Sequence, residues 1–462
     1  MIEQSGHHRS VSTGRCGKYL RRLLVLAVLL FPVAVTAAEP LSLRQAYEYA
    51  LQYDAQYLAA EADTKIAKEE VSKAFSGFLP NVKASTSRGR NRTDSVTPFS
   101  SQEGLYYNTL SHSLSLRQPL FNLGAIATYK QARAVKARSE SLFAGEHSSL
   151  MVRTAELYCN VLYSEENIAF IEAQVNASYE QLQQAKKQYA NGFGTITEIS
   201  EAQASYDLAL ADQLNSVAGL EFSKRELERI TGVYADNLCK LEARKLVLDK
   251  PAPDNVEAWV TLAEENNSGI RAARHEVEIA RKEIDKNKAA RYPQLDLWAG
   301  RSYSVSENNY TIGSTYDTWS LSVQLSMPVY TGGYTSASVR QATFRRQKAS
   351  EDLNRQARGV VSDVRKYYEA QLNSIVQVRA YEQAVKSSET ALEGTRKGFQ
   401  AGFRTNSEVL DAMKKLLEAR RSLARTRYQY ILNRIMLRDS AGILTESDMD
   451  VIDRFFVAKS GS

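Results

Sequence analysis

The sequence predicts an α+β membrane protein in which a tandem repeat supplies four β-strands and long α-helical coiled coils to each subunit. Three observations predict this fold class. The two halves of the chain repeat at a nearly constant offset, each half contains runs of alternating polar and apolar residues, and each contains a long proline-free stretch with a seven-residue apolar repeat. Four strands are too few to close a barrel, so we expect three subunits to form one of twelve strands.

The duplication is clearest at two turn segments. YANGFGTITEISEAQ begins at Tyr189, and FQAGFRTNSEVLDAM begins 210 residues later at Phe399. Upstream, Pro80 corresponds to Pro293 at an offset of 213. We therefore expect a signal peptide over 1–38, a first structural repeat over 39–250, a second structural repeat over 251–445 and a C-terminal tail over 446–462.

Each repeat is expected to begin with a helix, over 41–77 in the first and 254–291 in the second, which ends before a proline. Two extended runs follow. In the second repeat the apolar residues Trp319, Leu321, Val323, Leu325 and Met327 alternate with Thr, Ser and Gln, which is typical of a strand with one polar and one apolar face.

Closure by three copies would place the polar faces around a lumen and the apolar faces against lipid, with every strand edge paired. The alternative is a soluble sheet packed on helices. That alternative does not explain why the strands border long, highly polar helices with no globular core between them.

Long helices come next in each repeat. The stretch from Ala125 to about Ala190 lacks proline, spans roughly 66 residues and would be about 100 Å long. Apolar residues recur in it every seven positions, as expected of a coiled coil: Val161, Ile168, Val175, Leu182 and Tyr189. A shorter helix returns from each turn, and the two shorter helices of a repeat together match the long one in length. The irregular segment 233–253 is expected at their junction.

Residues 1–38 have the features of a secretory signal: a basic start, the 13-residue apolar run Leu23 to Val35, and small residues up to Ala38. A membrane anchor is the alternative, but 13 residues are too few to cross a bilayer of about 30 Å as a helix. The remaining chain has 54 basic and 52 acidic residues, so its charge predicts no nucleic-acid binding.

The sequence contains no catalytic or metal-binding pattern. His112, His147 and His275 stand alone without ligand spacing, and there is no glycine-rich phosphate loop, so we expect no enzyme activity, cofactor or metal. Cys159 and Cys239 are both expected near the middle of the helical region, and whether they form a disulfide stays open.

The two G-F-x-T-x-x-E turns, the strands that end in proline and the tandem layout resemble the TolC family of outer-membrane efflux and type I secretion channel proteins, from about Leu41 to Gly442. The resemblance implies a homotrimeric duct in the outer membrane of a Gram-negative bacterium, with a helical tunnel across the periplasm. It also implies partners: a periplasmic membrane-fusion adaptor, an inner-membrane transporter of the ABC or proton-driven type, and outer-membrane lipid.

Glu408 and Asp411 lie three residues apart, on one face of the returning helix. Favourable contact with the helix dipole is sufficient to explain acids in this position. The resemblance implies a further role, in which these two acids surround the periplasmic entrance as a gate and selectivity element. Three subunits would then contribute six carboxylates.

The resemblance also implies a latch between the repeats, which falls on Arg404 in the second repeat and on Thr197 and Glu198 in the first. Phe399 stands where the family has a tyrosine and has no hydroxyl to donate, so we expect the latch to depend mainly on Arg404 and Glu198. The expected adaptor contacts are the residues of the two turns: Gly192, Phe193, Thr195, Gly402, Phe403 and Thr405.

The preferred function is therefore an outer-membrane duct subunit for protein secretion, multidrug efflux or both. The alternative is a periplasmic coiled-coil adaptor or scaffold that never inserts, which predicts solubility without detergent. An enzyme with a helical scaffold would lack site residues. The sequence does not identify the cargo, because the transporter selects it.

Overall fold

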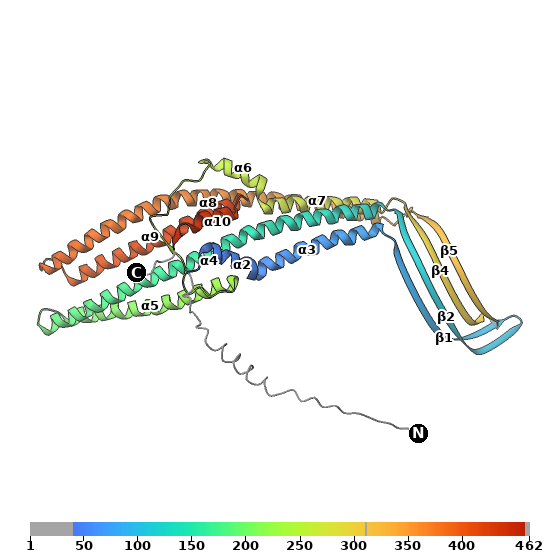
Figure 1. The fold of residues 1–462 in the computed structure, drawn as a ribbon, viewed down its shortest axis with the longest axis horizontal. Helices are drawn as coiled ribbons and strands as arrows, with labels where there is room; N and C mark the ends of the chain where they lie inside the picture. Colours follow the sequence, from blue (N-terminus) through green and yellow to red (C-terminus); the bar gives the residue numbers. More distant parts are fainter. Residues whose placement is uncertain (1–39, 310–311, 458–462) are drawn as a thin grey trace, which may run out of the picture. The chain divides into compact units, whose positions relative to one another are not determined.

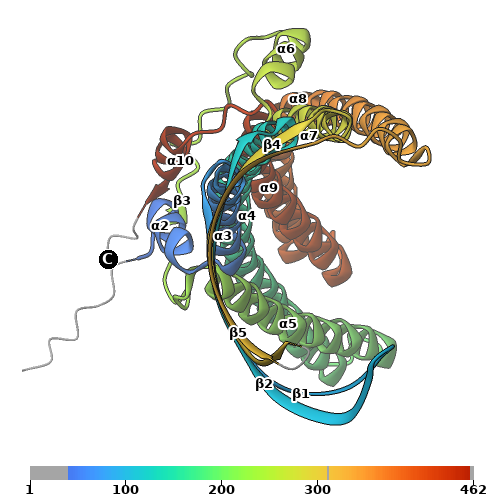
Figure 2. The same cartoon turned by 90° about the vertical axis from the view of Figure 1, so that its right-hand side faces the viewer.

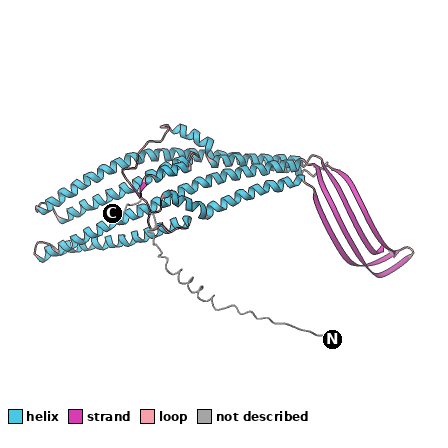
Figure 3. Ribbon diagram, in the orientation of Figure 1, coloured by secondary structure: helices cyan, strands magenta, loops and turns pink. Residues whose placement is uncertain are grey.

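A computed structural model describes residues 40–309 and 312–457, and those from Leu41 onward belong to one compact unit (Figures 1 and 3). The predicted signal peptide and the last five residues of the predicted tail lie outside the described residues. Helices of the first half are α2 (Leu43–Tyr53), α3 (Ala55–Phe75), α4 (Leu123–Ala190) and α5 (Ile196–Thr231), with a short 3₁₀ turn, η2 (Ser76–Phe78). Those of the second half are α6 (Val256–Asn266), α7 (Ser268–Ala289), α8 (Tyr334–Gln400), α9 (Asn406–Ser440) and α10 (Glu446–Asp453).

The first helix of each half is interrupted, so the expectation of continuous helices over 41–77 and 254–291 was wrong. Asp54 leaves the helical region with ψ 114° and accepts a hydrogen bond from Tyr57 N at 2.7 Å, which starts a new helix. Asn267, 213 residues later, caps α7 in the same way through Ile270 N at 3.1 Å. Asp54 is buried, and its charge is compensated by Arg153 at 3.2 Å.

The four long strands form an antiparallel sheet in the order β1-β2-β4-β5, which is strongly curved (Figure 2). Their bounds are Asn81–Thr97, Ser100–Phe121, Gln294–Asn309 and Ile312–Ser326. The register places Leu114 between Ala84 and Arg301, and Ser113 between Ser85 and Ser302. The predicted alternation of faces is therefore confirmed, and β1 and β5 each keep one unpaired edge within the chain.

The helices pack side by side in one curved layer. Like the sheet, this layer has two edges that no helix of the described chain covers. Near the strands the contacts run from α3 to α4, from α4 to α7 and from α7 to α8. Toward the turns they run from α5 to α4, from α4 to α9 and from α9 to α8. None of the helices in the described part of the chain has the length and the apolar composition that a bilayer-spanning helix needs.

The largest core lies at the junction of α2, the middle of α4, the end of α5 and α9. Tyr158 is fully buried there, and its hydroxyl donates to Leu41 O at 2.9 Å and to Cys239 O at 3.0 Å. The segment predicted as a tail contributes α10 and the short strand β6 (Phe456–Val457), which pairs with β3 (Lys240–Leu241). This core joins the irregular segment between the repeats to both long hairpins.

Cys159 and Cys239 both belong to this core and neither forms a disulfide among the described residues, which answers the open question. Burial raises the pKa of each thiol, so both stay protonated at neutral pH. Protonated, buried thiols react slowly, so they act here as small apolar side chains.

Candidate functional site at the helix hairpin turns

The two long helices end in the same way. After α4, Gly192 adopts φ +77° and Phe193 N donates back to Gln188 O at 3.0 Å. After α8, Gly402 adopts φ +79° and Phe403 N donates to Gly398 O at 2.8 Å. A positive φ at this position favours glycine, because a Cβ would be strained there.

The next helix of each hairpin starts with a capping box. Glu198 N donates to Thr195 Oγ1 at 3.3 Å while Thr195 N donates to Glu198 Oε2 at 3.0 Å. Thr405 and Glu408 form the same pair of bonds at 3.3 Å and 2.7 Å. The glycine, threonine and glutamate of the repeated motif are therefore explained by the turn itself.

The phenylalanine of each motif is not explained by the turn. Phe193 is 89% exposed and Phe403 is 86% exposed. Two aromatic side chains held in water at the ends of rigid hairpins contribute nothing to the packing of the described chain, and exposed apolar groups of this kind mark contact sites for other proteins.

The predicted gate acids differ in their surroundings. Glu408 Oε1 accepts a hydrogen bond from Arg404 Nη1 at 2.6 Å. Its pKa is lowered, first by the hydrogen bond from the Thr405 backbone and then by Arg404, so the carboxylate stays ionised at any physiological pH. Asp411 lies one turn further along α9 and has no ion pair within 4 Å among the described residues, so its charge is the less compensated one.

A cavity of about 430 Å³ separates the two hairpins and brings several of the predicted residues together. Asp411, Arg404 and Phe399 line it from the second repeat, and Glu198 and Glu201 from the first. Glu408 and Thr197 do not line this cavity. Asp411 of the second repeat and the two acids of the first therefore face one space, together with the cations Arg404 and Lys414.

The predicted bond from Arg404 to Glu198 is not among the contacts of the described residues. Arg404 is paired with Glu408, and Glu198 is engaged in its own capping box. Thr197 is exposed. The latch stays a prediction. The structure shows that Glu408 competes with Glu198 for the Arg404 guanidinium.

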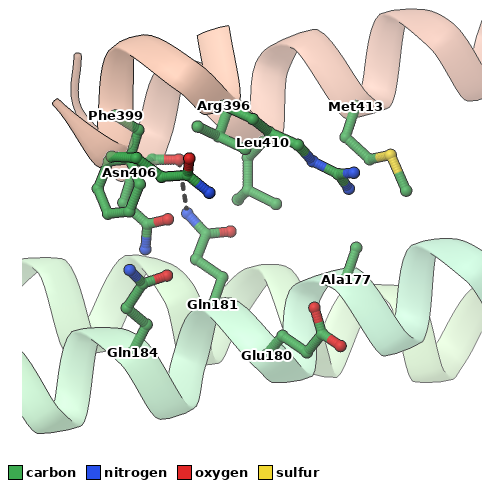
Figure 4. Close-up of a pocket in the computed structure, with 11 residues that line it drawn as sticks. Ala177, Glu180, Gln181, Gln184, Arg396, Phe399, Asn406, Leu410 and Met413 are labelled. Carbon is green, nitrogen blue, oxygen red and sulfur yellow. Dashed lines mark hydrogen bonds between the residues drawn. The ribbon is translucent and has the colours of Figure 1, made fainter. Parts of the chain in front are cut away.

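Gln181 is a residue that the sequence did not single out. Its Nε2 donates to Asn406 O, at the start of α9, at 3.3 Å, and so links the two hairpins (Figure 4). The side chain is 9% exposed, and its Oε1 has no partner among the described residues. A glutamine next to the heptad position Leu182 gives no signal in the sequence, because its burial depends on the second hairpin.

Gln181 also lines a second cavity of about 480 Å³, together with Glu180, Arg396, Phe399 and Met413 (Figure 4). Phe399 lines both cavities, as do Gln181, Asn406 and Leu410. The end of the molecule thus offers two polar cavities between its hairpins, flanked by the exposed phenylalanines.

Comparison with known proteins shows which family has this arrangement. The outer membrane efflux protein family matches residues 46–233 and 259–443. The chain is 34% identical over 426 residues to the alkaline protease secretion protein AprF of Pseudomonas aeruginosa, covering 90% of this chain and 88% of that protein. It is 33% identical over 422 residues to the outer membrane protein TolC of Vibrio cholerae, covering 90% and 94%.

Solved structures agree in fold. The chain is similar to the CmeC outer membrane channel of Campylobacter jejuni with a TM-score of 0.75 at 16% identity, covering 89% of each chain. It is similar to VceC of Vibrio cholerae with a TM-score of 0.72 at 20% identity, covering 87% of this chain and 96% of that one. These likenesses confirm the predicted combination of barrel strands and a helical tunnel.

The alternative of a scaffold that never inserts is not favoured by these relatives, and channels of this kind are trimeric and work with efflux or secretion machinery. The repeat, the sheet with two open edges and the paired hairpins all agree with the matches over both halves of the chain. The chain therefore belongs to the outer membrane efflux protein family, as a TolC-like subunit of an export channel in the outer membrane of a Gram-negative bacterium.

Proposed function

We propose that three copies of this chain form a duct for polypeptides, and that the duct receives its cargo from a periplasmic adaptor and an inner-membrane ABC transporter. The paired hairpin turns carry the proposal. Phe193 and Phe403 are exposed at the end of each hairpin, and the cavities between the hairpins are open to a partner. A helical partner could insert apolar side chains there and satisfy Gln181 Oε1.

Two named relatives support polypeptide cargo. AprF is described as an alkaline protease secretion protein, and PrtF of Dickeya chrysanthemi, 31% identical over 447 residues, as a proteases secretion protein. Small-molecule efflux through a proton-driven transporter is the second candidate, since BepC of Brucella suis, 24% identical, is described as an efflux protein. One duct can serve both, because the transporter selects the cargo.

We further propose that the turn region is the gate. In a trimer, Glu408 and Asp411 would contribute six carboxylates around the entrance, and a cluster of like charges in a narrow opening attracts cations. Glu198 and Glu201 of the first repeat line the same cavity between the hairpins as Asp411 of the second. We assign selectivity to the second repeat on the family resemblance, which puts its two acids at the periplasmic entrance.

Single-channel recording in planar bilayers tests the duct directly. We expect detergent-purified protein to be trimeric and to give discrete current steps that divalent or trivalent cations block from the periplasmic side. Monomeric protein that gives no current would overturn the proposal. Export of a protease from cells that lack their own channel, supplied with an ABC transporter and adaptor, distinguishes polypeptide cargo from efflux.

Arg404→Ala tests the latch. Because exposed ion pairs contribute at most about 1 kcal/mol, we expect the closed–open equilibrium to shift toward open by about two- to fivefold and the mean conductance to rise. The same change exposes the charge of Glu408, so block by cations should become stronger. Arg396→Ala, in the neighbouring cavity, is the matched control. Unchanged conductance would remove Arg404 from the latch.

A further inference from the structure

One face of the sheet has the composition of a lipid-facing surface. Trp319, Leu321, Val323 and Leu325 alternate along β5, and each is more than 60% exposed. The next apolar residues in this series are Met327 and Val329, both exposed. Within β5, which ends at Ser326, the series from Trp319 to Leu325 covers six residues, about 20 Å along the strand and about 15 Å along the membrane normal at a tilt of 40°.

On the same face, Asp317 follows Trp319 in the direction away from Ser326, so Trp319 marks one edge of the apolar surface. It is the edge farther from the helices, because the other end of β5, at Ser326, leads through a short connection to α8 at Tyr334. The helical tunnel of this family lies in the periplasm. The Trp319 edge therefore belongs to the outer leaflet, and an aromatic residue at this depth is typical of a membrane interface.

Beyond this edge the same face carries three arginines in a column: Arg88, Arg90 and Arg92 of β1. The register aligns Ala84 with Leu114, Arg301 and Trp319 across the four strands. Arg88 is four residues beyond Ala84, about 13 Å further along the strand, and Arg92 is eight residues beyond. All three side chains are exposed and, by alternation, point to the lipid side.

The acids on this face are already engaged. Glu307 accepts hydrogen bonds from Asn108 N at 2.9 Å and Asn108 Nδ2 at 3.0 Å. Asp94 accepts from Gly104 N and lies 3.9 Å from Arg92 Nε. Asp317 is paired with Arg301 at 2.7 Å.

Arg88 and Arg90 form no ion pair within 4 Å among the described residues, and their electrostatic interaction with Glu307 acts across a longer distance. The Arg90 guanidinium lies 5.6 Å from the centre of the Tyr106 ring, and that of Arg92 lies 5.9 Å from it, on the opposite strand. The tyrosine thus holds part of the column in place. The column therefore keeps two guanidinium groups available to an anion at headgroup depth.

We propose that Arg88, Arg90 and Arg92 bind the phosphate groups of a phosphorylated glycolipid in the outer leaflet. Guanidinium groups bind phosphate in a bidentate manner, and a cluster of basic residues beside an apolar surface recognises anionic lipid. β1 is an edge strand, so in the trimer the lipid would lie over a seam between subunits. The proposal depends on the outer-membrane location and not on the cargo or the gate.

The test compares binding of bisphosphorylated hexa-acyl lipid A with binding of the same lipid after removal of both phosphates, by native mass spectrometry of detergent-purified trimers. At low salt we expect Arg88→Gln with Arg90→Gln to weaken binding of the phosphorylated lipid roughly 30-fold, since each basic residue near an anionic surface contributes about fivefold. Binding of the dephosphorylated lipid should not change.

Lys186→Gln with Lys187→Gln removes the same charge from exposed positions near the hairpin turn and should leave lipid binding unchanged. Unaltered trimer content and conductance would show that the arginine double variant is folded. If the double variant does not fold, the single variants Arg88→Lys and Arg90→Lys replace it, because lysine keeps the charge and loses the bidentate geometry. Equal binding of both lipids by the wild-type trimer, or equal loss in the lysine control, would overturn the proposal.

Discussion

Phe344→Glu is expected to leave the purified protein monomeric and to abolish export. Phe344 lies on α8, one end of the series of packed helices, and is 68% exposed; Ile66 lies on α3, the other end, and is 65% exposed. A trimer closes when α8 of one subunit meets α3 of the next. Burying a phenylalanine contributes about 2 to 3 kcal/mol per interface, and a carboxylate in its place removes that contribution and adds the cost of desolvating a charge.

Size-exclusion chromatography with light scattering in detergent measures the outcome. Phe344→Leu keeps most of the apolar area and should stay trimeric. Gln347→Glu adds the same charge at an exposed position of α8 without removing an apolar side chain, and it separates a charge effect from a packing effect. A trimeric, conducting Phe344→Glu protein would mean that α8 is not at the subunit interface.

Glu408→Gln combined with Asp411→Asn is expected to remove block of the channel by multivalent cations. The substitutions keep the shape of both side chains and remove six charges from the trimer. Clustered charges raise the local counter-ion concentration by one to three orders of magnitude, so we expect the blocking concentration to rise on the order of 100-fold. Because Arg404 already compensates Glu408, Asp411→Asn should account for most of the change.

Titration of cation block in planar bilayers provides the measurement. Glu198→Gln with Glu201→Gln changes the corresponding acids of the first repeat and is the matched control. If the control variant loses block as strongly as the double variant in the second repeat, the selectivity element would have to be shared between the repeats. If neither variant loses cation block, the acids only stabilise the N-termini of their own helices.

Much of the fold was predictable because it depends on local rules. Proline breaks, alternation with period two and apolar residues every seven positions each act within one segment, and β5 and α4 lie where these patterns placed them. The interruptions at Asp54 and Asn267 were missed, although the repeat aligns the two residues. A polar residue in the middle of a helical pattern interrupts the helix only when the chain bends around another helix. At Asp54, Arg153 also compensates the buried charge.

The candidate site was predictable to a smaller extent. Gly192, Thr195 and Glu198 could be identified because glycine turns and capping boxes are local motifs. The partner of Arg404 could not be identified from the sequence. Arg404 has a long, flexible side chain with Glu198 and Glu408 as candidate partners, and which of them it pairs with depends on how the hairpins pack. Gln181 was missed for the same reason: only contact with α9 buries it.

The sequence by itself determined the duplication, the sheet with one polar and one apolar face, the lengths of the long helices and the chemistry of the two turns. Each of these follows from residue periodicity or from hydrogen bonds between near neighbours. Only the tertiary structure decided which charges are paired, that Cys159 and Cys239 form no disulfide, and that Arg88, Arg90 and Arg92 align beyond the apolar surface. These outcomes depend on register and packing between segments far apart in the chain.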